Sequence, residues 1–184
     1  MSLHRNQELK EAVLNLPIKE KDKLLVRLIN KDKMLLKQLH YELLEDSNDL
    51  EDRIIELKNN LESLFENNVN RIKNIPVYSN YQALSSTLRQ ASGIANEHEK
   101  ITKDKFSVLE ARLLILQEAF ERYPSLFSPS ALTPAFKLHK YINGRVRNAN
   151  KLYENLHEDL QFDLKDQIEF VLAFALDHHL DHDL

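Results

Sequence analysis

The residues best suited to chemistry lie near the C-terminus, where three histidines and three aspartates fall between residues 177 and 183. On a helix, His178 and His182 would lie one turn apart on the same face, a spacing at which two imidazoles can bind zinc or a similar metal. A further ligand could come from the Glu-x-x-His pair Glu154 and His157, since this short motif also occurs in di-iron helical bundles. These four residues are the candidate metal ligands.

The same cluster is also typical of a polar tail. Histidines in the last turn of a helix interact favourably with the helix dipole and keep the end of the chain hydrated. A carboxylate-bridged metal site also needs matching motifs on several helices, and the sequence contains a single Glu-x-x-His pair. We therefore predict no cofactor and keep a metal-binding helical bundle as the alternative.

A second candidate site is a basic stripe between residues 137 and 151. The cations spaced to share one helix face, with no acid between them, are Lys137, Lys140, Arg147 and Lys151. Such a face can bind phosphate or nucleic acid by releasing counterions. However, the chain has a formal charge of −4, and residues 154–184 hold nine Asp or Glu against one Lys, which offers an intramolecular partner. A solvated or ion-paired face is therefore expected, and nucleic acid is only the third hypothesis.

Other patterns that carry catalysis are missing from the sequence. There is no glycine-rich phosphate loop, nucleophile elbow or His-Glu-x-x-His pair, and no cysteine. Glu97, His98 and Glu99 are adjacent, so their side chains point in different directions on a helix, and we expect them on a solvent face. The sequence favours a protein that is not an enzyme.

The segments that could direct the chain to a membrane are too short or too polar. Residues 1–10 lack the apolar core of a signal peptide. The longest apolar run, within residues 168–176, is interrupted by Glu169 and is far shorter than the roughly 20 residues of a membrane span. With no cysteine in the chain, we expect a cytoplasmic protein without a membrane partner.

These side chains must be positioned by helices. Two glycines and five prolines in 184 residues leave little turn chemistry for strands, and no Asn-Gly or Asp-Gly hairpin signal occurs. Apolar residues recur at spacings of three and four, the helical period. We predict an all-α, irregular bundle of about six or seven helices in a single domain, residues 1–184, with residues 1–76 and 77–184 as an alternative subdivision.

The first part of the chain predicts a long antiparallel helical hairpin. Its first arm would run from Pro17 to Glu45, either continuous or broken where Asp32 could cap a new helix, and continuity is slightly favoured. Its second arm would begin at residues 47–49 and end near Pro76. Residues 17–37 contain seven Lys or Arg against three Asp or Glu, whereas residues 42–66 contain two against nine, so the arms should attract each other. Helices of about 27 residues extend about 40 Å, so part of the hairpin should project.

The remaining helices are expected at residues 79–100, 104–123, 134–160 and 162–176. In the first of these, Ser92 and Gly93 would allow a close helix neighbour. In the third, the inward stripe includes Leu138, Ile142 and Val146. The last helix is apolar on all sides, which predicts that it is central or covered by a partner chain. The leading hypothesis is a non-enzymatic helical interaction module that self-associates as a homodimer or binds another protein.

Overall fold

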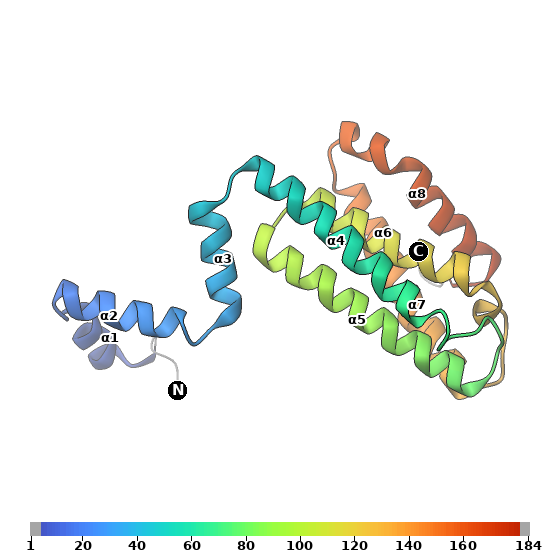
Figure 1. The fold of residues 1–184 in the computed structure, drawn as a ribbon, viewed down its shortest axis with the longest axis horizontal. Coiled ribbons are helices and arrows are strands. Elements are labelled where there is room, and N and C mark those ends of the chain that lie inside the picture. Colours follow the sequence, from blue (N-terminus) through green and yellow to red (C-terminus); the bar gives the residue numbers. More distant parts are fainter. Residues whose placement is uncertain (1–4, 181–184) are drawn as a thin grey trace. The chain divides into compact units, whose positions relative to one another are not determined.

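The computed structural model describes residues 5–180, and this part of the chain is all-α (Figure 1). A short 3-10 helix, η2 (Pro124–Phe127), lies between α6 and α7. The α-helices are α1 (Gln7–Leu14), α2 (Ile18–Ile29), α3 (Lys33–Leu44), α4 (Ser47–Asn68), α5 (Tyr78–Thr102), α6 (Lys105–Arg122), α7 (Thr133–Glu154) and α8 (Glu158–Asp177). The predicted all-α multi-helix bundle is confirmed, with eight α-helices in the described residues instead of six or seven. None of the described helices is long and apolar enough to cross a membrane.

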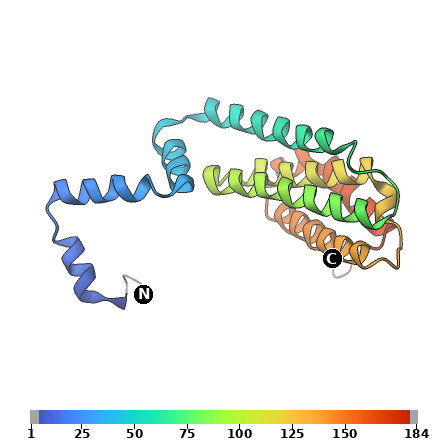
Figure 2. The ribbon, with the colours of Figure 1, turned by 60° about the horizontal axis from the view of Figure 1, so that its bottom comes forward.

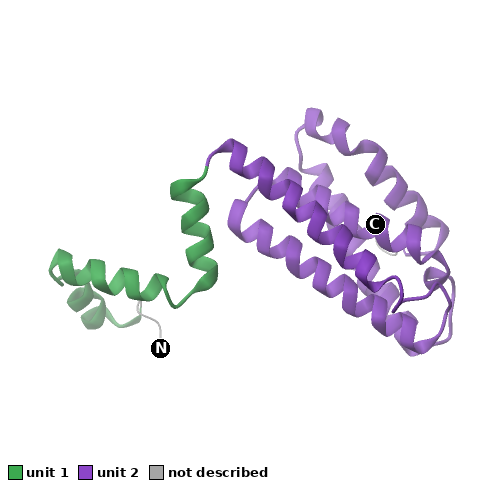
Figure 3. Ribbon diagram, viewed as in Figure 1, with its two compact units in different colours: residues 1–45 green, residues 46–184 purple. Residues whose placement is uncertain are grey.

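The chain forms two compact units, residues 1–45 and 46–184 (Figure 3). Unit 1 contains α1, α2 and α3, and unit 2 contains the other helices. The division therefore falls between α3 and α4. The alternative boundary expected at residues 76 and 77 lies inside unit 2, in the connection between α4 and α5.

The first arm of the expected hairpin is two helices, which corrects the preference for a continuous one. The carboxylate of Asp32 accepts hydrogen bonds from the backbone N–H groups of Met34 and Leu35, at 2.9 and 3.1 Å, and so caps α3. A cap of this kind satisfies donors that a new helix leaves free, so it stabilises a start at Lys33.

A long antiparallel hairpin is formed by α4 and α5, which run in opposite directions (Figure 2). The hairpin expected between residues 17–45 and 47–76 would join the two units, and it stays a prediction. α4 begins with a capping box in which Asp46 and Asp49 each accept a hydrogen bond from the other's backbone N–H. Its buried side chains are Leu57, Leu61 and Phe65, and it packs against α5 and α6. The acidic segment that the sequence predicted as the second arm of the first hairpin is α4, and it packs along α5.

α6 is the central helix of unit 2, because it packs against α4, α5, α7 and α8. The sequence predicted that α8 is either central or covered by a partner chain, and the central position is wrong. α8 buries one face through Leu164, Ile168, Val171 and Ala175. Phe162 and Leu176 are 79% and 62% exposed, since among the described α-helices α8 packs mainly along α6 and α7. Whether a partner chain covers this outer face stays a prediction.

An aromatic cluster joins α6, η2 and α8 at one end of the bundle. The ring of Phe174 stacks on Phe120 with centroids 4.1 Å apart and meets Phe127 edge-on at 5.7 Å. On its other side Phe174 stacks on His178, at 3.9 Å. These contacts define which face of α8 points inward.

Candidate functional site

The structure describes three of the four candidate metal ligands, Glu154, His157 and His178, and it does not bring these three together. His157 is the N-cap of α8 and His178 its C-cap, so the 20-residue helix separates them by about 30 Å. Glu154 accepts a hydrogen bond from Asn150 at 3.0 Å, and His178 contacts the carbonyl oxygen of Phe174 at 3.0 Å. Among residues 5–180 no group of three potential ligands could hold a metal. His182 lies outside the described residues, so its pairing with His178 stays a prediction.

The basic stripe, by contrast, lies on one exposed face of α7. Opposite this face, the helix buries Leu138, Ile142, Val146 and Ala149 in the core, as the sequence predicted. All four cations of the stripe are exposed, namely Lys137, Lys140, Arg147 and Lys151. Among the residues that the structure describes, none of these four side chains forms an ion pair or a hydrogen bond. The expected acidic partner within residues 154–184 is therefore not found in its described part, up to residue 180.

Two hollows flank the N-terminal half of α7. One, of about 530 Å³, lies between α5 and α7, and its lining includes Tyr78, Arg89 and Lys137. The other, of about 450 Å³, lies between α7 and the segment that follows α8, and its lining includes Phe136, Lys140 and Arg147. Both volumes fall in the range of small-molecule sites. Neither hollow is lined by an acidic side chain of the described residues.

Hydrogen bonds hold the second hollow in shape. The ring Nε2 of His139 lies 2.9 Å from the carbonyl oxygen of Leu126, which ties α7 to η2. The amide of Asn143 donates to the carbonyl oxygen of Leu180 at 2.9 Å. Leu180 itself is buried, so the segment after α8 is fixed against α7 up to this residue. The wall of this hollow is therefore formed by parts of the chain that are held together by hydrogen bonds, namely α7 and the segment up to Leu180.

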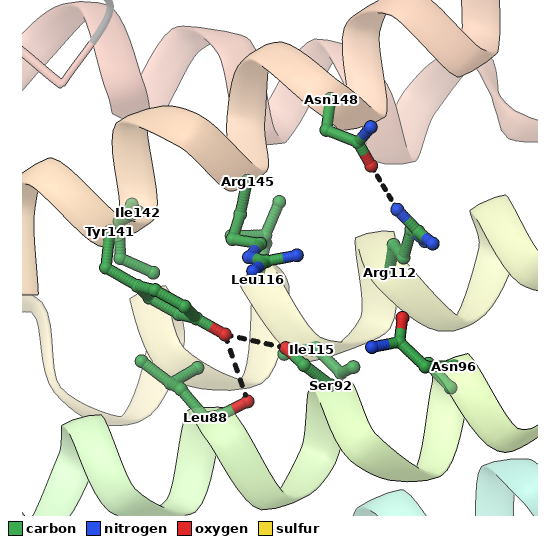
Figure 4. Close-up of a pocket in the computed structure, with 11 residues that line it drawn as sticks. Leu88, Ser92, Asn96, Arg112, Ile115, Leu116, Tyr141, Ile142, Arg145 and Asn148 are labelled. Carbon is green, nitrogen blue, oxygen red and sulfur yellow. Dashed lines mark hydrogen bonds between the residues drawn. The ribbon is translucent and has the colours of Figure 1, made fainter. Parts of the chain in front are cut away.

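A third polar site joins α5, α6 and α7 (Figure 4). Arg112 pairs with Glu99 at 2.6 Å and also donates to the side-chain oxygen of Asn148. Beside it, the hydroxyl groups of Ser92 and Tyr141 are 2.8 Å apart. The enclosed space is only about 20 Å³, which is room for about one water molecule. This network therefore connects three helices and does not form a ligand cavity.

Sequence reasoning overlooked this polar network. Arg112 stands between the core residues Ala111 and Leu113, and a charged residue inside an apolar run is a signal that could have identified it. The expected close approach at Gly93 is wrong, because a Cβ there would meet no atom within 4 Å. Its neighbour Ser92 makes the helix contact instead, through Tyr141.

His98 is buried, which corrects its expected place on a solvent face. Its side chain contacts the hydroxyl of Ser107 at 2.9 Å, and the two residues are 7% and 1% exposed. Burial lowers the pKa of His98, and Asp104 opposes this effect while Arg53 adds to it. A buried His–Ser pair cannot reach a substrate, so we assign it the structural role of joining the end of α5 to the start of α6.

Unit 1 presents a surface of a different kind. No residue of α1, α2 or α3 is buried. The large apolar side chains that are exposed in this unit are Leu9, Leu14, Ile18, Leu25, Val26, Leu28, Leu36, Leu43 and Leu44. Their exposed fractions range from 47% to 76%. This is a large apolar surface for a three-helix unit.

The fold and these surfaces define the chain as an all-α multi-helix protein with an N-terminal unit that exposes large apolar side chains and with a basic helix face. No protein-family model matches the sequence, and no curated protein or solved structure is significantly similar to it. Function must therefore be argued from the surfaces themselves.

Proposed function

We propose that this protein is a non-enzymatic helical interaction module that self-associates through the apolar faces of α1, α2 and α3. The observation that carries the proposal is the absence of any buried residue in these three helices. A unit of about 45 residues is close to the lower limit for burying a core of its own, and oligomerisation is a common remedy. Unit 1 therefore gains a core when a second copy covers it.

The exposed apolar area suits a dimer. Full burial of one Leu, Ile or Val side chain contributes about 1.5–3 kcal/mol. At about 25 cal/mol per Å² of buried apolar surface, this free energy corresponds to about 60–120 Å² per side chain. Nine side chains exposed by roughly half to three quarters then offer about 300–650 Å². Since about 57% of an interface is apolar, the whole contact would be about 600–1,100 Å² per copy. Stable interfaces bury about 800 Å² per partner.

A second copy is the occupant that charge and symmetry favour. Residues 1–45 contain nine Lys or Arg against seven Asp or Glu, a net charge of +2, so two copies of unit 1 repel each other only weakly. The same patch on both copies can form a two-fold interface, the commonest arrangement of soluble oligomers. We also propose a cytoplasmic location, consistent with a chain that lacks cysteine, and cell fractionation would test it.

Light scattering coupled to size-exclusion chromatography tests the proposal on the full chain. We expect twice the chain mass at micromolar concentration. Replacing Leu25 with Glu should weaken the dimer at least tenfold, because each copy loses about 1 kcal/mol of apolar burial and places a charge in the interface. The matched control is Ile55→Glu in α4 of unit 2, since Leu25 and Ile55 are both 57% exposed. This control should remain dimeric.

Two results would contradict self-association through unit 1. One is a wild-type chain that stays monomeric at 100 µM, a concentration well above the Kd of about 1 µM that corresponds to −8.2 kcal/mol. The other is a dimer that Leu25→Glu leaves intact or that Ile55→Glu dissociates equally. Circular dichroism of each variant would establish that the helices are retained.

A further inference from the structure

We propose that the outer face of α7, with the two hollows beside it, binds single-stranded nucleic acid. This site lies wholly within unit 2 and is independent of the self-association proposed for unit 1. The proposal depends on three observations: cations that have no partner among residues 5–180, exposed aromatic rings next to them, and hollows large enough for a base.

The cations form an extended track. Lys137 and Lys151 are 14 residues apart on α7, which corresponds to about 21 Å. Lys140 and Arg147 lie between them, and Arg89 on α5 adds a charge across the first hollow. The first acidic residue of α7 is Glu154, at the end of the helix. A single phosphate cannot reach cations spread over this distance, whereas a polymer of phosphates can.

Each hollow combines such a cation with an exposed aromatic ring. Tyr78 is 57% exposed and lines the hollow that also contains Arg89 and Lys137. Phe136 is 67% exposed and lines the hollow that also contains Lys140. An exposed phenylalanine in this position contributes little to the core, yet it offers a flat surface for stacking. Proteins that bind single strands combine a basic track with aromatic rings on which bases stack.

The aromatic positions favour a single strand over other polyanions. In a duplex the base faces are stacked on one another, so they cannot enter a hollow beside α7. An anionic membrane would satisfy the cations but has no planar group to stack on Phe136 or Tyr78. RNA and DNA share the phosphate and base chemistry used here, so the experiment must include both.

Fluorescence anisotropy tests the proposal on the full chain. The probes are two labelled single strands of 12 nucleotides, oligouridine for RNA and oligodeoxythymidine for DNA. We expect binding at 20 mM salt that weakens steeply as salt is added. The slope of log K against log salt should be about −0.7 per cation engaged, hence about −3 for four or five cations. Duplex DNA, mononucleotides and anionic lipid vesicles should all bind at least tenfold more weakly.

Three variants separate charge from stacking. Replacing Lys140 and Arg147 together with Gln should reduce the salt slope by about 1.4. Phe136→Ala should weaken binding about fivefold to 150-fold and leave the slope unchanged. An abasic strand of equal length should bind more weakly than the normal strand, and Phe136→Ala should not weaken it further. The matched control is Phe162→Ala on α8, where the ring is 79% exposed and lines neither hollow.

Several results would overturn the proposal. No binding at 20 mM salt, or binding that the Lys140 and Arg147 double variant does not change, would exclude the basic face. Equal affinity for the abasic strand, duplex or vesicles would show that bases are not recognised. An equal loss with Phe162→Ala would exclude a specific role for Phe136. Unchanged circular dichroism in every variant would establish that folding is not the cause.

Discussion

Replacing Phe174 with Ala tests which face of α8 belongs to the core. Phe174 is partly buried, and its ring stacks on Phe120 at 4.1 Å and meets Phe127 edge-on at 5.7 Å. Burial of an aromatic ring of this size contributes about 1.5–3 kcal/mol, and each aromatic pair adds about 0.5–1.5 kcal/mol. We therefore expect the free energy of unfolding to fall by about 3 kcal/mol. For a unit of this size, Tm should fall by about 6–12 °C.

The control for this variant is Phe162→Ala on the same helix. Both changes remove the same atoms, but the Phe162 ring is 79% exposed and should contribute within about 0.5 kcal/mol. Urea unfolding followed by circular dichroism measures both, since the midpoint shifts while the slope stays constant if only stability changes. Equal losses for the two variants, or a loss below about 1 kcal/mol for Phe174→Ala, would refute the inward orientation of the cluster.

Two further predictions concern α5. Burial lowers the pKa of His98 in the folded state, so the unfolded chain binds a proton at this ring first as pH falls. The stability that depends on a neutral His98 is therefore complete above about pH 6.5, the pKa of a free histidine. It is lost progressively as pH falls below this value. Unfolding free energies measured from pH 7.5 to 5 should fall less in His98→Gln than in the wild type, and parallel curves would contradict this. Gly93→Ala should raise stability by about 0.5–1 kcal/mol, because Gly93 is an exposed helical residue with open space around it, and a lower urea midpoint would contradict this.

Local signals predicted the helices well. Asp104 is the N-cap of α6, at the start of the helix expected at residues 104–123. Asp32 is the N-cap of α3, which is the alternative that the sequence favoured less. The inward stripe of α7 at Leu138, Ile142 and Val146 is buried, and the basic stripe on its other side is exposed. Such features depend on residues within a few positions of each other, so the sequence alone was enough.

The wrong predictions concern helix neighbours. α8 is at least as apolar as α6, yet α6 is central, because four of the described α-helices pack around it whereas two of them pack mainly along α8. The sequence also did not predict that α4, the expected acidic arm, packs along α5. Composition shows how apolar a helix is but not how many neighbours it has.

The same distinction applies to the candidate sites. The sequence by itself determined the all-α fold and the exposed cations of α7, because helical periodicity is a local property. Only the tertiary structure placed exposed aromatic rings beside those cations, buried His98 against Ser107, and left the histidines at 157 and 178 at opposite ends of α8. The physical reason is that cavities and burial depend on contacts between residues far apart in the chain, which local spacing does not specify.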